Sequence, residues 1–379
     1  MIYDALWKLP GGGESATALL PAPEEIRRQY PNPCAWGVGV QDCVFNGVPL
    51  LLAALAADDH RLSLSVYRGL KRCAEVAGVP GFVARGVSPV DGKSHYFNSS
   101  RDTYTLFVYG MYRLYRHCLA TAEMRREIIR MLVDVARYAE KCVVAENDYS
   151  LLQADGRTGI VGRLWSEDPE SGLLRPHEAL RLPMFYAAAF AVSGDRHWRE
   201  AELRYADDAI RLSEGRLAED MRASILDQMQ VSIRLLWECE TDAGRRQRYA
   251  QLLQANADFA EEKIVPRLRD KAERTGWAMK EAMEDWRKVP FQADSLIVGG
   301  RVYDVPEHPA STVEEPYVEL AHVILVEARV PGRAVSAGTA RLFAEAMDGI
   351  DCETVKCANA VNALLAGYAL ECLEKGKKR

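Results

Sequence analysis

Apolar residues follow a helical period through almost the whole chain. One stretch shows the i, i+3, i+4, i+7 spacing clearly, with Ile128, Met131, Leu132, Val135 and Tyr138. Such spacing places one apolar stripe along a helix. The alternation typical of strands is rare, and its best example, residues 296–303, is expected to form a small hairpin within a loop. The sequence therefore predicts an all-α protein.

The lengths of the connections constrain how these helices are arranged. The pattern predicts twelve helices, at about 41–57, 61–77, 101–119, 123–143, 176–193, 196–213, 218–239, 243–266, 270–286, 313–328, 335–349 and 353–373. Short connections at 58–60, 120–122 and 193–195 alternate with long ones at 78–100, 144–175 and 287–312. Because a short connection makes antiparallel neighbours, we expect hairpins that close into an (α/α)6 toroid, with its long loops on one face. We interpret residues 1–379 as one such domain, in which 1–40 form an extended N-terminal segment.

Composition excludes several classes of function. The net charge is −6 and the pI is about 5.8, which does not fit a basic nucleic-acid-binding surface. The apolar run at 48–57 contains Pro49 and ends at two aspartates, so it is too short to span a bilayer. The start of the chain lacks the pattern of a signal peptide. We expect no nucleic-acid partner and no membrane association, while a homo-oligomer is left open.

Cysteine and histidine usage predicts neither disulfides nor a metal. Nine cysteines at scattered spacings, with no CxxC, are typical of reduced thiols in a cytoplasmic protein. The seven histidines are dispersed and show no HxxxH spacing. The sequence therefore predicts a cytoplasmic location, no metal and no cofactor.

The first polar cluster precedes the first long helix. Trp36 stands shortly before Asp42, which is placed in the first helical turn. A carboxylate there is stabilised by the helix dipole, so Asp42 is either a plain helix-start acid or a catalytic carboxylate beside an aromatic platform. Gly37-Val38-Gly39 is not a phosphate loop, because the full glycine pattern and a preceding strand are missing.

The second cluster, residues 81–104, is the densest in polar and aromatic side chains. It contains Arg85, His95, Tyr96, Asn98, Arg101, Asp102 and Tyr104. Ser99 or Ser100 is expected to cap the next helix, and Asp102 then stands in a capping-box-like position. A cap alone does not require so many arginines and aromatic residues. The mixture instead suits a pocket for an anionic, hydroxyl-rich ligand, because arginine can bind a carboxylate through two parallel hydrogen bonds.

The third cluster follows the fourth predicted helix. It contributes Asp155, Arg157, Arg163 and Trp165, with Glu167 and Asp168 as further candidates. His177 then opens the fifth helix and is either a helix-start residue or a ligand contact. The alternative for this cluster is an ordinary surface loop.

Residues 81–104, taken with 36–42, resemble the (α/α)6-barrel carbohydrate-active enzymes, and the nearest are the unsaturated uronyl hydrolases and glucuronidase-like hydrolases. The Trp-x-Arg-Gly stretch of the unsaturated uronyl hydrolases is represented only by Arg85-Gly86. The resemblance implies an oligosaccharide substrate that contains a uronic acid.

The resemblance and the residue mixture together favour a glycoside hydrolase. Asp42 and Asp102 would then be the catalytic carboxylate pair. Arg101 and Arg85 would bind the sugar carboxylate. Tyr104 and His95 would bond hydroxyl groups, and Trp36 or Trp165 would stack on a ring.

Three alternatives remain open from the sequence. A polysaccharide lyase would use His95, Tyr96, Asn98 and Arg101. A sugar epimerase on the same toroid would use histidines as acid and base. A helical scaffold or sugar-binding protein would show no turnover.

Overall fold

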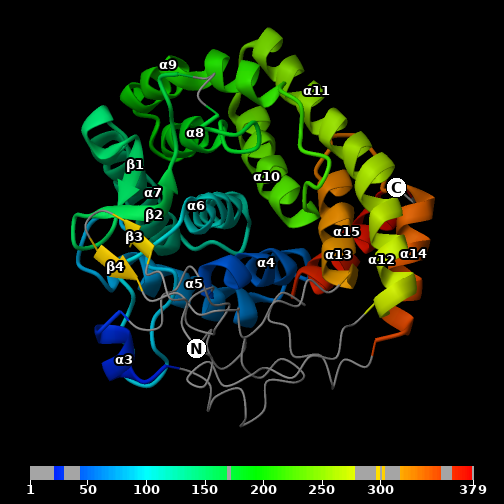
Figure 1. Ribbon diagram of the computed structural model, residues 1–379, viewed down its shortest axis with the longest axis horizontal. Coiled ribbons are helices and arrows are strands. Elements are labelled where there is room, and N and C mark those ends of the chain that lie inside the picture. Colours follow the sequence, from blue (N-terminus) through cyan, green and yellow to red (C-terminus); the bar gives the residue numbers. More distant parts are fainter. Residues whose placement is uncertain are drawn as a thin grey trace.

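The computed structural model describes residues 21–29, 43–168, 172–277, 296–298, 301–303, 316–350 and 361–377. In this part of the chain, six helices form the inner ring. They are α4 (Cys43–Ala56), α6 (Arg101–Arg116), α8 (Arg181–Ser193), α10 (Ala223–Cys239), α13 (Pro316–Ala328) and α15 (Val361–Lys377). Each packs against the next, and α15 packs against α4, which closes the ring (Figure 1). The toroid predicted from the sequence is confirmed.

Outer helices cover this ring. They are α5 (His60–Glu75), α7 (Ala122–Cys142), α9 (Arg196–Ser213), α11 (Ala243–Phe259) and α14 (Ala337–Asp348), and each packs against the inner helix before it. A π-helical segment, η4 (Ala260–Ile264), joins α11 to α12 (Val265–Thr275), which packs against α13. The shorter elements are α3 (Pro23–Arg27) and the turn η2 (Ala145–Asn147).

Burial explains which helices lie inside. Helix α13 is buried at every position from Pro316 to Glu327, and α8 is buried from Arg181 to Ala189. Helix α5, in contrast, buries a single stripe that includes Val66, Leu70 and Cys73. A helix that is apolar on all sides needs neighbours on all sides, whereas a one-sided helix can cover a surface.

The outer helices begin at short turns, which share one face of the ring. At each turn a side chain caps the helix that follows by accepting a backbone N–H: Asp59, Thr121, Asp195, Asp242 and Ser336. Gly194 adopts the left-handed conformation that ends α8. We call this side the turn face.

The inner helices begin on the opposite face, the loop face, where the long connections lie. Strands β1 (Ser150–Leu152) and β2 (Thr158–Arg163) form an antiparallel hairpin there. The loop before α6 joins it, because Ala154 N–H donates to Phe97 O at 2.9 Å and Ser100 bridges to Val161. The second and third polar clusters of the sequence therefore share one structure.

Several sequence expectations change. The hairpin expected at 296–303 is present as β3 (Leu296–Val298) and β4 (Arg301–Tyr303), but the β1–β2 hairpin was missed because its strands lack alternation. The helices expected at 243–266 and 270–286 form one continuous run to Thr275, and residues 278–286 lie outside the described part. Within the segment expected to be extended, Pro23–Arg27 are helical. No helix among the described residues is long and apolar enough to cross a membrane.

Candidate active site

Asp102 occupies the first turn of α6, at the loop face. Ser100 caps this helix by accepting the Thr103 N–H at 3.2 Å, so the capping prediction is confirmed for Ser100. The Asp102 carboxylate instead pairs with Arg181 Nη1, at the start of α8. Asp102 keeps 41% of its side chain exposed, whereas Arg181 keeps only 2%. The carboxylate therefore remains open to a ligand while its partner is fixed inside the ring.

Arg181 connects three inner helices. Its Nη2 donates to Gln228 Oε1 of α10 at 3.1 Å, while Nη1 reaches Asp102 of α6. Its Nε is buried and has no hydrogen-bond partner among the described residues. A buried guanidinium with one unused donor is costly to keep unless something else binds it.

A second ion pair lies beside the first. Arg101 pairs with Glu178, which is 2% exposed. His177 Nε2 lies 3.5 Å from Glu178 Oε1, and the Arg175 N–H donates to Glu178 Oε2 at 3.1 Å. Glu178 is therefore held by two contacts from the segment before α8 and by one from α6.

Both carboxylates are held ionised. Burial alone raises the pKa of Asp102, but the Arg181 ion pair and hydrogen bond outweigh it and lower the pKa below its usual value. Burial likewise raises the pKa of Glu178, but the hydrogen bond from His177 and the charge of Arg101 lower it to about 2. A carboxylate held ionised can act as a base or nucleophile, but it is a poor proton donor at neutral pH.

Among the described residues, several arginines lie around Asp102. Arg181, Arg101 and Arg85 each lower its pKa, and Arg175 acts on Arg101. Counted over these six described groups alone, there are four positive and two negative charges. The N-termini of α6 and α8 add to the positive potential, because helix N-termini attract anions.

Another polar group lies further along the inner helices. His322 Nδ1 of α13 lies 3.1 Å from Asp227 Oδ2 of α10, and Arg329 pairs with the same carboxylate. Burial lowers the pKa of His322 to about 4. Arg329 also stacks over the Tyr109 ring, 5.9 Å from its centroid, so α6, α10 and α13 share this group.

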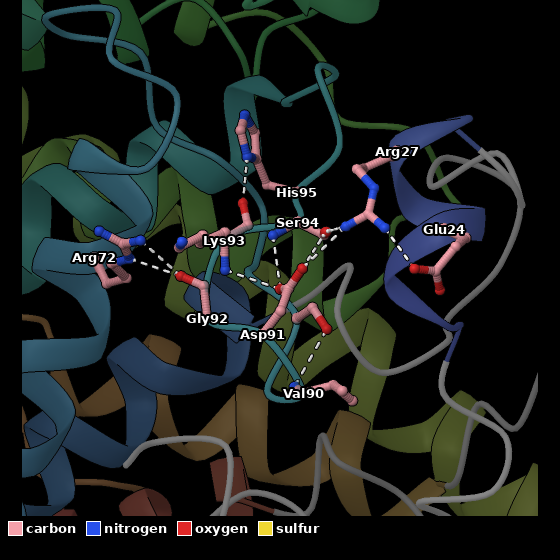
Figure 2. Close-up of polar contacts among 10 residues, drawn as sticks. Glu24, Arg27, Arg72, Val90, Asp91, Gly92, Lys93, Ser94 and His95 are labelled. Atoms are coloured by element: carbon pink, nitrogen blue, oxygen red, sulfur yellow. Dashed lines mark hydrogen bonds and ion pairs between the residues drawn. The ribbon is translucent and has the colours of Figure 1, made fainter.

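Figure 2 shows the loop that carries His95. Asp91 closes the loop by accepting the Lys93 and Ser94 N–H groups, each at 2.9 Å, and Arg27 Nη1 reaches the same carboxylate at 3.2 Å. His95 Nδ1 contacts Lys93 O at 2.9 Å. These contacts fix the loop at the rim of the loop face.

Several predicted ligand contacts have structural partners instead. Tyr104 is fully buried and accepts the Val83 N–H at 3.2 Å, so its hydroxyl serves the core rather than a substrate. Tyr96 and Asn98 are 0% and 1% exposed, which does not favour them as the reactive groups of a lyase. Trp165 is largely buried against Tyr205 of α9, at 4.8 Å between ring centroids.

The remaining predicted residues are placed as follows. Asp155 and Arg157 lie in the β1–β2 turn, 4.0 Å apart, and Arg163 ends β2 and pairs with Asp148. Asp42 and Trp36 lie outside the described residues. Of the predicted set, the structure thus brings together Asp102, Arg101, Arg85 and His177.

Sequence reasoning missed Glu178, Arg181, Gln228 and the Asp227–His322 pair. The sequence did contain a signal for Arg181, because this charged residue begins a helix whose residues as far as Ala189 are buried and almost all apolar. A charged residue at the end of a wholly buried helix needs a partner, but the sequence does not say that the partner stands 79 residues earlier.

Comparisons with known proteins add little to this geometry. No protein-family model and no curated protein matches the sequence. Among solved structures, the chain is similar to a mutant of reducing-end-xylose-releasing exo-oligoxylanase in complex with xylobiose. The TM-score is 0.42 and the identity is 13%, over 86% of this chain and 80% of that one. A likeness this distant leaves the function to be argued from the site itself.

Proposed function

We propose that this protein is a glycoside hydrolase that acts on oligosaccharides containing a uronic acid, and that its substrate binds at the loop face. The observation that carries the proposal is the group of arginines around the ionised, partly exposed Asp102. A hydrolase needs a positioned carboxylate, and a uronate needs cationic donors. The described part of the loop face offers both within one cluster.

Asp102 is proposed as the base or nucleophile rather than the proton donor. Arg181 and Arg101 lower its pKa, which suits a group that must be ionised in the free enzyme. Asp42, the other catalytic candidate from the sequence, is proposed as the proton donor. A cytoplasmic location remains part of the proposal and rests on the cysteine pattern.

The substrate charge is tested with two nitrophenyl glycosides that differ only in the group at C6, a glucuronide and a glucoside. A charge-assisted hydrogen bond contributes about 1.5–3 kcal/mol, so we expect kcat/KM for the uronate to exceed that for the neutral sugar by about 10- to 100-fold. Equal rates would contradict the role given to the arginines.

The carboxylate is tested with Asp102→Asn. We expect kcat to fall by at least about 100-fold with the far-ultraviolet spectrum unchanged. The matched control is Asp208→Asn, which removes another carboxylate paired with an arginine, Arg211, on the exposed side of α9. With a uronate oligosaccharide that carries no nitrophenyl group, a product with the ultraviolet absorbance of a conjugated, unsaturated uronate would instead identify a lyase, and recovery of an isomerised sugar would identify an epimerase.

A further inference from the structure

The turn face carries a second cluster of groups that can bind a ligand, on the opposite side of the ring from Asp102. Asp58 lies in the turn between α4 and α5, and His117 and Cys118 lie in the turn between α6 and α7. One ligand atom from each residue lies within 4.8 Å of the others. His117 Nε2 is 3.9 Å from Asp58 Oδ1, and His117 Nδ1 is 3.8 Å from Cys118 Sγ.

The backbone holds these side chains in place. The Asp58 backbone is left-handed, with φ +54°, and its N–H donates to Leu55 O at 3.2 Å. His117 ends α6, and its carbonyl accepts from Ala120 N–H and Arg125 Nη2, both at 3.2 Å. The two turns are therefore ordered before any ligand binds, and only the Asp58 and Cys118 side chains, both exposed, need to rotate.

The donor types indicate which ion fits. A thiolate, an imidazole and a carboxylate suit Zn²⁺ and similar divalent transition metals, whereas Mg²⁺ and Ca²⁺ prefer oxygen ligands alone. Zn–N and Zn–O bonds are about 2.0–2.2 Å long, so at a tetrahedral angle a nitrogen and an oxygen on one ion lie about 3.4 Å apart. His117 Nε2 and Asp58 Oδ1 are 3.9 Å apart, so the exposed Asp58 side chain must approach the ring by about 0.5 Å for both to bind one ion.

The position also favours a cation. Helices α4 and α6 both end at this turn face, and the carbonyl ends of helices attract positive charge. The Arg125 guanidinium donates to the carbonyls of Tyr115 and His117 and offsets part of this attraction.

Histidine must bind the metal as a neutral ring. At present the Leu119 N–H points at His117 Nδ1 at 3.3 Å, so the ring proton lies on Nε2. In the metal-bound form Nε2 holds the ion, the proton moves to Nδ1, and the long Leu119 contact is lost. The Cys118 thiol loses its proton on binding, so one proton is released for each ion.

We propose that Asp58, His117 and Cys118 bind a Zn²⁺ ion that joins the α4–α5 and α6–α7 turns, with water in the fourth position. The site is separate from Asp102 and does not depend on the proposed function.

The test uses the full chain after treatment with a chelator and a thiol reductant, and the probes are Zn²⁺ and Co²⁺. We expect one Co²⁺ per chain, with an intense thiolate-to-cobalt charge-transfer band and release of about one proton. With Zn²⁺ at 100 times its Kd, the thermal midpoint should rise by about 3 °C. Zn²⁺ should also protect Cys118 from alkylation, and this test requires no variant.

Variants locate the site. Cys118→Ser should abolish the charge-transfer band, and Asp58→Asn, which keeps a side chain suited to the left-handed backbone, should weaken binding by at least about tenfold. His60→Gln changes an exposed histidine beside the same turn and should have no effect. An unchanged band in Cys118→Ser, equal weakening by His60→Gln, or alkylation of Cys118 at the same rate with Zn²⁺ would overturn the proposal.

Discussion

Glu202 of α9 is a buried acid whose charge works against folding. It is 1% exposed, and Arg199 Nη1 donates to its Oε2 at 2.7 Å. Arg199 is shared with Glu240, at 2.5 Å, and Glu202 Oε1 has no hydrogen-bond partner among the described residues. Burial outweighs the attraction of Arg199 and raises the pKa of Glu202 to about 7.

The raised pKa sets the size and sign of a pH effect. Between pH 4.5 and about 7, the unfolded chain has lost the Glu202 proton while the folded protein keeps it. The stability that the neutral carboxyl contributes is therefore fully present below pH 4.5 and is lost as the pH rises through 7. At 1.36 kcal/mol per pKa unit, the complete loss is about 3 kcal/mol, of which about 2 kcal/mol falls between pH 5.5 and pH 8.

Glu202→Gln removes this titration. We expect the free energy of unfolding of the variant, relative to the natural protein, to rise by about 2 kcal/mol between pH 5.5 and pH 8, measured by urea unfolding at both values. This corresponds to about 2 to 3 °C for a chain of 379 residues. Glu200→Gln, an exposed acid on the same helix, is the control. A flat difference between the two pH values would refute the reasoning.

Other substitutions test the packing and the site. Gly81→Ala should lower the free energy of unfolding by at least about 3 kcal/mol, because its Cβ would lie 2.1 Å from a backbone oxygen and its φ is +83°. Gly78→Ala, at φ +66° with open space around it, should lower it by about 1 kcal/mol. Urea unfolding measures both. In the natural protein, the free energy of unfolding should fall by about 3 kcal/mol as the pH falls from 6.5 to about 4, because His322 is protonated there only in the unfolded chain. His322→Gln should remove this fall. Arg181→Met should destabilise by about 2 kcal/mol, which is less than breaking a fully buried pair costs because Asp102 is partly exposed. Nuclear magnetic resonance titration should show a raised pKa for Asp102 in this variant.

The parts of the fold that follow local rules could be predicted from the sequence. The short turns carry their own signals, such as Asp195 after Gly194 and Thr121 before α7. Each signal acts within three residues, so a single sequence contains it in full. The alternation of short and long connections then predicts the ring, because short turns fix neighbours.

The site could be predicted only in part, since its partners are far apart in the sequence. Asp102 was found because it follows a serine cap, a local pattern. Arg181 and Gln228, which complete its surroundings, lie 79 and 126 residues later in the chain, and nothing in their own segments specifies that distance. Tyr104 was expected at a substrate because its residue type suits a sugar site, whereas the structure buries it on α6 with its hydroxyl accepting the Val83 N–H.

The hydrogen-bonding groups at the helix ends find their partners in different ways on the two faces of the ring. This difference explains why the fold could be predicted from the sequence and the site only in part. At the turn face, the outer helices are capped by the side chain that precedes them. At the loop face, Ser100 caps α6 in the same way, but Leu180 before α8 and Arg222 before α10 provide no side-chain cap. Glu319 of α13 caps α10 instead, accepting the Ala223 N–H at 2.7 Å. The N-terminus of α8, which has no side-chain cap, can attract an anion, and it lies on the face at which we propose that the substrate binds.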